Sequence, residues 1–238
     1  MINIVTPLDP TLKSVTRLGR RISARTNSHL LIIRPGEECK YAARKYIDDL
    51  PQGSIVVFLG HGRSDALFGS KGKKWNAEAF VSSDAKYEDL ISFYNDENFV
   101  DNSCYSLFKN KTLICFTCNS VTLANALLQN NAVSILGFDN IPSTREEIEE
   151  QCRITAPNSH LISSLNGCIN VAMLQCLSYS YDRKLELGEM EQLLKTEFQL
   201  AIMKALSSKA RYRYQLADIL TTIRKGIKVV GDRKQIFK

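Results

Sequence analysis

The chain has 238 residues, of which 44% are hydrophobic and 24% are charged, and its formal net charge is +6. This composition is close to the globular average, which argues against a disordered, collagen-like or coiled-coil protein. No apolar run approaches the roughly 20 residues that a membrane span needs, and the N-terminus lacks the features of a signal peptide. We therefore expect a cytoplasmic globular protein without a membrane partner.

Seven cysteines are an odd number, and they are scattered through a chain that carries no export signal. A disulfide framework is therefore not expected, and a reducing cytosol fits the pattern better. Most of these thiols are predicted to be small buried hydrophobic groups. No metal or organic cofactor is implied, because zinc would need more closely spaced ligands and the sequence has no second CxxC and no HxxxH.

The charge is unevenly distributed along the chain. Residues 1–34 carry six basic and one acidic side chain, residues 200–238 carry ten and two, and residues 35–199 carry 15 and 22. Basic ends around an acidic middle can indicate nucleic-acid binding. More often they are solvated helix faces or ends that dock on the middle, and no known nucleic-acid motif is present. Nucleic acid is therefore not expected as a partner.

The first two thirds of the chain predict alternating strands and helices. The candidate strands are residues 2–5, 30–33, 55–59, 113–116 and 133–137. The candidate helices are residues 12–22, 37–50 and 120–129. We expect Asp9 to cap the first of these helices, with Pro10 at its first position, and Asn119 or Ser120 to cap the third. Repeated β-α-β units with short loops imply a parallel sheet that helices cover.

The second half of the chain has a different character. The stretch 63–110 is irregular, and we expect one helix near 84–94 in an excursion over the sheet edge. A Ser143-x-x-Glu146 capping box then opens an acidic helix, and long amphipathic helices follow. These long helices are predicted over residues 158–181, 189–206 and 210–224. A final strand over 227–230 suggests that the helices cover the same sheet.

Two reactive residues follow consecutive buried strands of this predicted sheet. His61 comes after the run that ends at Leu59-Gly60, and Cys118 comes after the run that ends at Phe116-Thr117. In an open parallel sheet, ligands bind beyond the carboxyl ends of the strands. Because consecutive strands tend to be neighbours, we expect both side chains at the same rim. That is the arrangement of a Cys/His catalytic dyad.

The chemistry of a dyad requires these residue types. A free thiol has a pKa of about 8.5 and is mostly protonated at neutral pH. A partner imidazole, together with the helix N-terminus after Cys118, is expected to favour the thiolate, and the imidazole can also protonate a departing amine. Glycines bracket His61, so the N–H groups of Gly62 and Cys118 can form an oxyanion hole.

Other interpretations of the same residues stay open. Cys115 and Cys118 form a CxxC pair, so a thiol redox protein is one alternative. Cys115 belongs to the strand itself, where we expect a structural thiol that faces inward. The acidic run after Ser143 is most simply the dipole-favoured first turn of a solvated helix, and it comprises Glu146, Glu147, Glu149 and Glu150.

Four segments resemble a known family, namely VVFLGHG (56–62), LICFTCNS (113–120), VSILGFD (133–139) and IKVVGD (227–232). A hydrophobic strand followed by His-Gly, and a second one followed by Cys, is similar to the caspase-like cysteine peptidases of clan CD. Within that clan the bacterial CHAT-type peptidases look closest. The separation of His61 and Cys118 is near the approximately 50 residues typical of caspases.

The resemblance implies a caspase-like three-layer α/β sandwich, with a mainly parallel sheet and helices on both faces. We expect one peptidase domain over residues 1–238. Its core sheet would occupy about 28–140, its helical section about 143–224, and its closing strand 227–230.

The expected function is that of a cysteine endopeptidase that cleaves a specific protein or peptide substrate, in a regulatory or antiviral defence setting. Cys118 would be the nucleophile and His61 the general acid and base, with Gly62 and Cys118 forming the oxyanion hole. The residues around Cys118 differ from those of animal caspases, so a preference for Asp in the substrate does not carry over. Asp139 is the candidate for binding a basic substrate side chain. A catalytically idle caspase-fold interaction module is the other alternative, and a regulatory or sensor protein is a candidate partner.

Overall fold

The structure is a computed structural model that describes residues 2–9, 12–70, 98–142, 145–152, 154–155 and 157–237, with the main chain alone at 146 and 151. Three expectations lie outside the described residues. These are Pro10 at the first helical position, the helix near 84–94, and the Ser143-x-x-Glu146 capping box.

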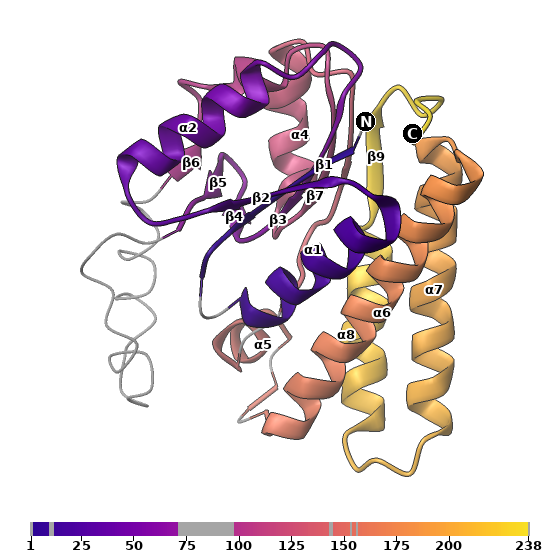
Figure 1. The fold of residues 1–238 in the computed structure, drawn as a ribbon. Helices are drawn as coiled ribbons and strands as arrows, with labels where there is room; N and C mark the ends of the chain where they lie inside the picture. Colours follow the sequence, from indigo (N-terminus) through magenta and orange to yellow (C-terminus); the bar gives the residue numbers. More distant parts are fainter. Residues whose placement is uncertain are drawn as a thin grey trace.

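A six-stranded, mainly parallel sheet forms the centre of the fold, in the order β2-β1-β3-β7-β8-β9 (Figure 1). Its strands are β1 (Ile2–Pro7), β2 (His29–Ile33), β3 (Ile55–Leu59), β7 (Thr112–Phe116), β8 (Ser134–Gly137) and β9 (Lys228–Gly231). Neighbouring strands run parallel from β2 to β8, and β9 runs antiparallel to β8. The predicted strands are confirmed. Since β1 lies between β2 and β3, the sheet starts before the expected limit near residue 28.

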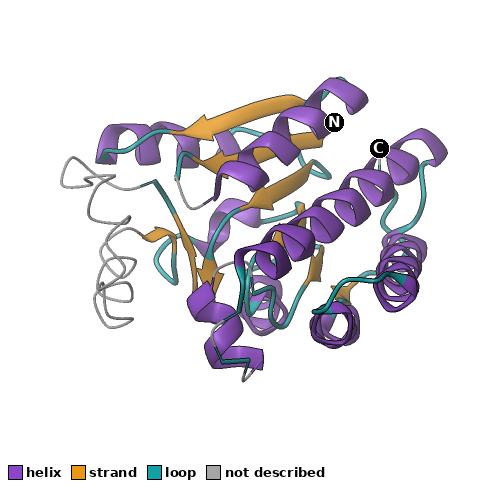
Figure 2. Cartoon of the chain, turned by 90° about the horizontal axis from the view of Figure 1, so that it is seen from below, coloured by secondary structure: helices purple, strands orange, loops and turns teal. Residues whose placement is uncertain are grey.

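Alternate residues of the buried strands belong to two different hydrophobic clusters. Ile55, Val57 and Leu59 of β3 face one cluster, whereas Val56 and Phe58 face the other. This alternation means that the strand is buried on both faces, as its continuous apolar run predicts. Helices therefore flank both faces of the sheet (Figures 1 and 2), and the α/β arrangement is compatible with a three-layer sandwich.

The helices divide between the two faces. The cluster on one face includes side chains of α1 (Lys13–Thr26), α5 (Arg145–Cys152), α6 (Ser159–Arg183), α7 (Leu187–Ser207) and α8 (Arg213–Gly226). The cluster on the other face includes side chains of α2 (Glu37–Asp48) and α4 (Ser120–Gln129). The predicted helices within the described residues are confirmed, with ends that differ by a few positions.

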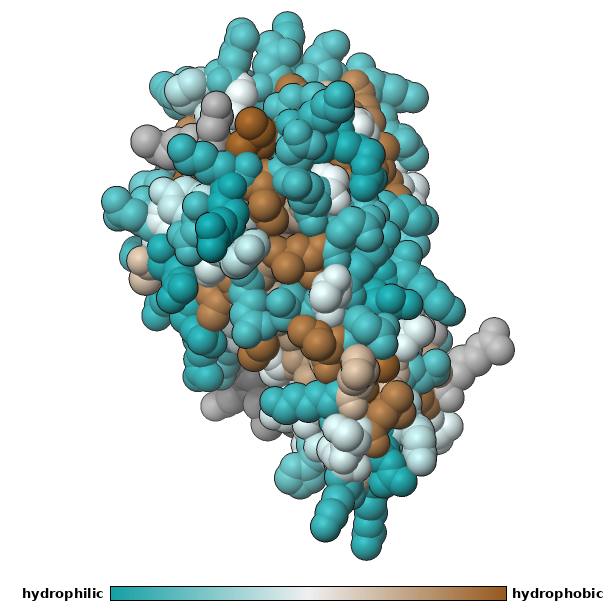
Figure 3. Space-filling model, turned by 90° about the vertical axis from the view of Figure 1, so that its right-hand side faces the viewer, coloured by the Kyte–Doolittle hydropathy of each residue, from teal (hydrophilic) through white to brown (hydrophobic). Residues whose placement is uncertain are grey.

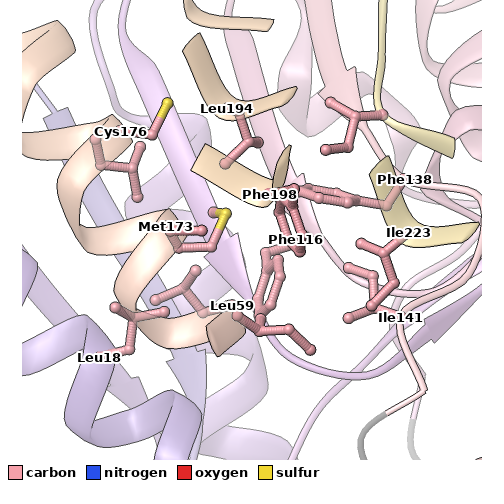
Figure 4. Close-up of a cluster of buried hydrophobic side chains, with 14 of the residues drawn as sticks. Leu18, Leu59, Phe116, Phe138, Ile141, Met173, Cys176, Leu194, Phe198 and Ile223 are labelled. Atoms are coloured by element: carbon pink, nitrogen blue, oxygen red, sulfur yellow. The ribbon is translucent and has the colours of Figure 1, made fainter. Parts of the chain in front are cut away.

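Helix α6 is long and apolar enough to cross a membrane by length and composition alone, and among the described residues it is the one helix with that property. Its position in the fold accounts for its composition. Leu165, Ile169 and Met173 are buried in the cluster that α6 shares with the sheet and with α1 and α7. Figure 4 shows Met173 among the side chains of Leu18 from α1 and Leu194 from α7.

A small antiparallel sheet precedes η3 in the irregular stretch. It consists of β4 (Gly62–Arg63), β5 (Ala66–Phe68) and β6 (Asn98–Val100), and the 3-10 helix η3 spans Tyr105–Phe108. Arg44 of α2 fixes β6, because its guanidinium donates to the carbonyls of Phe99 at 2.6 Å and Asn98 at 3.0 Å. Strands of two or three residues are too short for an alternating pattern to be recognised in the sequence.

The starts of α1 and α4 test two of the predicted helix caps. Helix α1 begins at Lys13 with Leu12 as its N-cap residue, and Asp9 contributes its backbone carbonyl, which accepts the Leu12 N–H at 3.0 Å. Asn119 does stand at the N-cap of α4, but its φ is 55° and its side chain makes no capping hydrogen bond. Asn119 therefore occupies the predicted N-cap position of α4 without a side-chain capping bond, whereas the N-cap position of α1 is Leu12 and not Asp9.

Helix α7 leaves part of its outer face apolar. Leu200, Met203 and Leu206 are 54%, 58% and 45% exposed. The side of the molecule on which α7 lies shows apolar side chains interspersed with hydrophilic ones (Figure 3). Single exposed apolar residues of this kind are ordinary on protein surfaces.

Glu191 of α7 is a buried acid that ties this helix to the C-terminal part of the chain. Its carboxylate accepts hydrogen bonds from Lys195 Nζ at 2.6 Å, from Arg233 Nη1 at 2.6 Å and from the Val229 N–H at 3.1 Å. Burial raises the pKa of this carboxyl, but the hydrogen bonds from Lys195, Arg233 and Val229 outweigh it, and the net pKa is lowered.

We expect Glu191→Gln to lower the free energy of unfolding at pH 7 by about 1–3 kcal/mol, because the variant weakens two charge-assisted hydrogen bonds. The folded-state pKa of Glu191 lies below the unfolded value. The stabilisation is therefore present above the unfolded pKa and is lost as the pH falls through the folded pKa. Urea unfolding of both proteins at neutral pH and at about pH 3 measures this. The difference in free energy of unfolding between the wild type and Glu191→Gln should be smaller in acid than at neutral pH. An equal difference at the two pH values would contradict the lowered pKa of Glu191. Glu38→Gln, on the exposed start of α2, is the control.

Candidate active site

His61 and Cys118 occupy equivalent places at the ends of two paired strands. Leu59 of β3 and Phe116 of β7 are register partners, and each candidate residue lies two positions further along the chain. The Gly60 N–H donates to the Phe116 carbonyl at 3.4 Å, so the strands stay joined up to the turn. Leu59 and Phe116 face the same hydrophobic cluster. Both candidate residues accordingly line one pocket.

The pocket lies at the carboxyl ends of β3 and β7, where α1 and α6 approach the sheet. Leu12 and Val15 at the start of α1 and Ile169 of α6 supply apolar parts of its wall. Asn166 and Asn170, one turn apart on α6, add carboxamides to the lining. The wall of the pocket thus combines apolar side chains with a few polar groups.

The Cys118 thiol is held by the loop that follows β8. Its Sγ accepts the Ile141 N–H at 3.5 Å and lies 3.5 Å from the Ile141 carbonyl oxygen, to which the thiol donates. Burial and then the negative charge of Glu147 raise the pKa of Cys118 to about 12, against the lowering effect of the Ile141 N–H. The expected bias towards the thiolate is therefore wrong for this resting state, in which the thiol is protonated at neutral pH.

A tight turn joins β7 to α4 and carries the candidate nucleophile. Asn119 takes up the left-handed region with φ of 55°, which Asn tolerates better than most residues, and its N–H donates to the Asp139 carbonyl. The Ser120 hydroxyl accepts the Phe138 N–H at 2.8 Å and lies 2.9 Å from the Cys115 carbonyl, to which it can donate. These contacts fix the turn against the end of β8.

Gly62 begins the hairpin directly after His61. The Phe68 N–H donates to the His61 carbonyl at 3.0 Å, which makes Gly62 and Leu67 a non-hydrogen-bonded pair. The Gly62 N–H consequently points away from β5. A Cβ atom on Gly62 would lie 2.9 Å from Thr117 Oγ1, so the two turns approach each other closely here. Gly62 is not among the residues that line the pocket, and its role as an oxyanion donor stays a prediction.

The Asp139 side chain pairs with a lysine of the last strand. Its half-exposed carboxylate is 3.5 Å from Lys228 Nζ, at the start of β9. The described lining of the His61 pocket does not include Asp139. Its backbone instead supports the nucleophile turn through Asn119. Binding of a basic substrate side chain by Asp139 stays a prediction.

Sequence reasoning missed one charged residue at this site. Glu147 of α5 places its Oε1 3.9 Å from His61 Nδ1, and its side chain is 19% exposed. The expected solvated face is therefore wrong for Glu147, although Glu149 and Glu150 are exposed. Ile148 inside the acidic run is fully buried. An apolar residue at that position is the signal that could have indicated a buried face beside Glu147.

Cys115 faces away from the pocket. Its side chain is fully buried in the cluster on the opposite face of the sheet, which confirms the expected inward position. Burial raises the pKa of this thiol to about 12, and its sulfur lies 3.3 Å from Thr117 Oγ1. Among the described residues no cysteine forms a disulfide, and no three His, Cys, Asp or Glu side chains gather as a metal ion would require.

No protein-family model matches the chain, and a search of curated proteins finds no match. The chemistry of the pocket therefore has to follow from its own side chains. A thiol and an imidazole in one pocket wall can together support nucleophilic attack and proton transfer.

Proposed function

We propose that the chain is a cytoplasmic cysteine endopeptidase with a caspase-like fold, acting on a protein or peptide substrate in a regulatory or defence setting. One observation carries the proposal. His61 and Cys118 each lie two residues beyond a register pair of neighbouring parallel strands, and both line the same pocket. A thiol with an adjacent base is the minimal pair for acyl transfer by covalent catalysis. The flanked, mainly parallel sheet agrees with the fold that the sequence resembles.

In the proposed reaction His61 accepts and returns one proton in each of two half-reactions. As Cys118 Sγ forms a bond to the scissile carbonyl carbon, its proton passes to His61, and the carbonyl oxygen becomes an oxyanion that accepts the N–H groups of Gly62 and Cys118. His61 then gives the proton to the amine nitrogen, the C–N bond breaks, and a thioester remains. A water molecule that loses a proton to His61 then attacks the thioester carbonyl carbon. The C–S bond breaks, His61 returns that proton to Cys118 Sγ, and the carboxylic acid product leaves.

The protonated resting thiol makes His61 essential at the moment of attack. With a pKa of about 12, only about 10⁻⁵ of the Cys118 thiol is ionised at pH 7. The S–H group also donates to the Ile141 carbonyl and must turn from it before the proton can reach an imidazole. General-base assistance during attack therefore fits this site better than a preformed thiolate–imidazolium pair.

A set of peptidyl acyloxymethyl ketones with varied side chains tests the proposal. Such probes place a ketone where the scissile carbonyl would lie, and the methylene carbon beside it alkylates a catalytic thiol as a carboxylate leaves. We expect one adduct per chain, located at Cys118 by peptide mass spectrometry and absent from Cys118→Ala. His61→Ala should be labelled at least about 100-fold more slowly, because the thiol loses its base. Cys115→Ala is the matched control and should be labelled at the wild-type rate.

The other outcomes favour the alternative functions. Equal loss of labelling in Cys115→Ala and Cys118→Ala would point to a thiol redox protein that needs both sulfur atoms. If no probe labels any of the folded proteins, an idle interaction module becomes the better interpretation.

A further inference from the structure

We propose that Glu147 is a positioning residue that sets the protonation pattern of the His61 ring, an inference that rests on the proposed peptidase function. Glu147 Oε1 lies 3.9 Å from His61 Nδ1. The two side chains are only 19% and 12% exposed, so water screens their interaction less than that of a surface pair. The contact joins α5 to the turn after β3, two elements far apart in the sequence.

The packing of α5 determines which of its acids faces the site. Ile148 is fully buried, and Cys152 one turn further on packs against the same cluster, so this face of α5 lies on the core. On the outer face Arg145 and Glu149 form an exposed ion pair at 3.0 Å. Glu147 lies next to the anchoring Ile148, and α5 thereby holds its carboxylate beside the His61 ring.

A carboxylate beside Nδ1 has a defined effect on a neutral imidazole. It favours the tautomer that carries the hydrogen on Nδ1, because that N–H dipole points towards the negative charge. The basic nitrogen is then Nε2, the ring nitrogen that does not face the Glu147 carboxylate. In the proposed reaction Nε2 accepts the Cys118 proton, and a base that acts through Nε2 needs this tautomer, because the other one carries a hydrogen there and has no lone pair on that nitrogen.

The same charge acts on both members of the dyad. In the resting state Glu147 disfavours the Cys118 thiolate, which is the second cause of the raised pKa of that thiol after burial. Once the proton has passed from Sγ to the imidazole, the carboxylate stabilises the resulting imidazolium. Glu147 would therefore keep the free thiol protonated and still support proton transfer during attack.

Long-range ¹H–¹⁵N spectra of the histidine side chains measure the tautomer directly and require no catalysis. The chain has three histidines, so loss of one signal set in His61→Ala assigns the ring. At about pH 8 we expect the Nδ1–H tautomer of His61 in the full chain. Glu147→Gln should turn this major form into a minor one. Glu147→Asp, which keeps the charge, should retain it, as should the matched control Glu150→Gln on the exposed face of α5.

Kinetics provide the second measurement. We expect Glu147→Gln to lower kcat by about tenfold or more with little change in KM, while Glu147→Asp recovers activity and Glu150→Gln keeps it. An unchanged His61 tautomer in Glu147→Gln overturns the inference, whether or not the chain is a peptidase. A tautomer change in a protein whose wild type cleaves nothing overturns the peptidase function and leaves the coupling of Glu147 to His61 in place. If Glu147→Gln does not fold, a mixed tautomer in Glu147→Asp would count against the inference.

Discussion

His61→Ala should lower kcat/KM for peptide hydrolysis by about 10³-fold or more and leave the chain folded. The resting Cys118 thiol has a pKa of about 12, so attack depends on a base that removes its proton within the pocket. Without the imidazole, the reaction relies on the small fraction of thiol that ionises into water. His61 lies in the turn that follows β3 and lines the pocket, so we expect its truncation to enlarge the pocket and to leave the strands of the sheet in place. Initial rates on a probe-derived peptide substrate, together with thermal unfolding, measure both quantities.

The two other histidines supply matched controls. His29 is exposed at the start of β2, where its ring lies 4.9 Å from that of Tyr46, and His160 is exposed in the first turn of α6. His29→Ala and His160→Ala remove the same ring without touching the pocket, and they should keep wild-type kcat/KM. If His61→Ala stays within tenfold of the wild type, His61 is not the general base and the proposed dyad is wrong.

The sequence carried enough information to predict the sheet and the place of the candidate site. Continuous apolar runs such as 55–59 and 113–116 are typical of parallel strands that are buried on both faces. Because these strands are parallel neighbours, residues at equal distances beyond them must meet at one edge. The meeting of His61 and Cys118 in one pocket is thus a consequence of local patterns and chain topology.

The electrostatics of the site could not be predicted from such patterns. The pKa of Cys118 depends on burial beneath the loop that contains Ile141 and on the charge of Glu147, and both belong to segments that follow β8. Glu147 has the same residue type as its neighbours in the acidic run. What distinguishes it is the side of α5 that packs on the core, which depends on tertiary contacts of Ile148. The helix dipole favours every acid near the start of a helix, so it does not distinguish Glu147 from its exposed neighbours.

Gly62→Ala should reduce kcat/KM by about 100-fold and the free energy of unfolding by about 1–3 kcal/mol. A Cβ atom at this position would lie 2.9 Å from Thr117 Oγ1 and 3.0 Å from the Ala66 carbonyl oxygen. The first contact is with the residue directly before Cys118, and the second is with the backbone of the hairpin after His61. Relief of the clash therefore pushes the two turns apart, which separates the thiol from the imidazole. Kinetics and urea unfolding of the same preparation measure the two effects.

Two further variants test whether the loss in Gly62→Ala comes from the clash with Thr117 or from replacing a glycine by alanine in general. Gly167 lies within α6, and a Cβ there would have nothing within 4 Å, so Gly167→Ala should stabilise the helix by about 0.5–1 kcal/mol and leave activity unchanged. Thr117→Ala removes the hydroxyl that a Gly62 methyl would meet. If the clash displaces the turns, Gly62→Ala combined with Thr117→Ala should recover part of the kcat/KM that Gly62→Ala alone loses. Wild-type kcat/KM in Gly62→Ala would show instead that the close approach at Thr117 supports stability and does not set the geometry of the dyad.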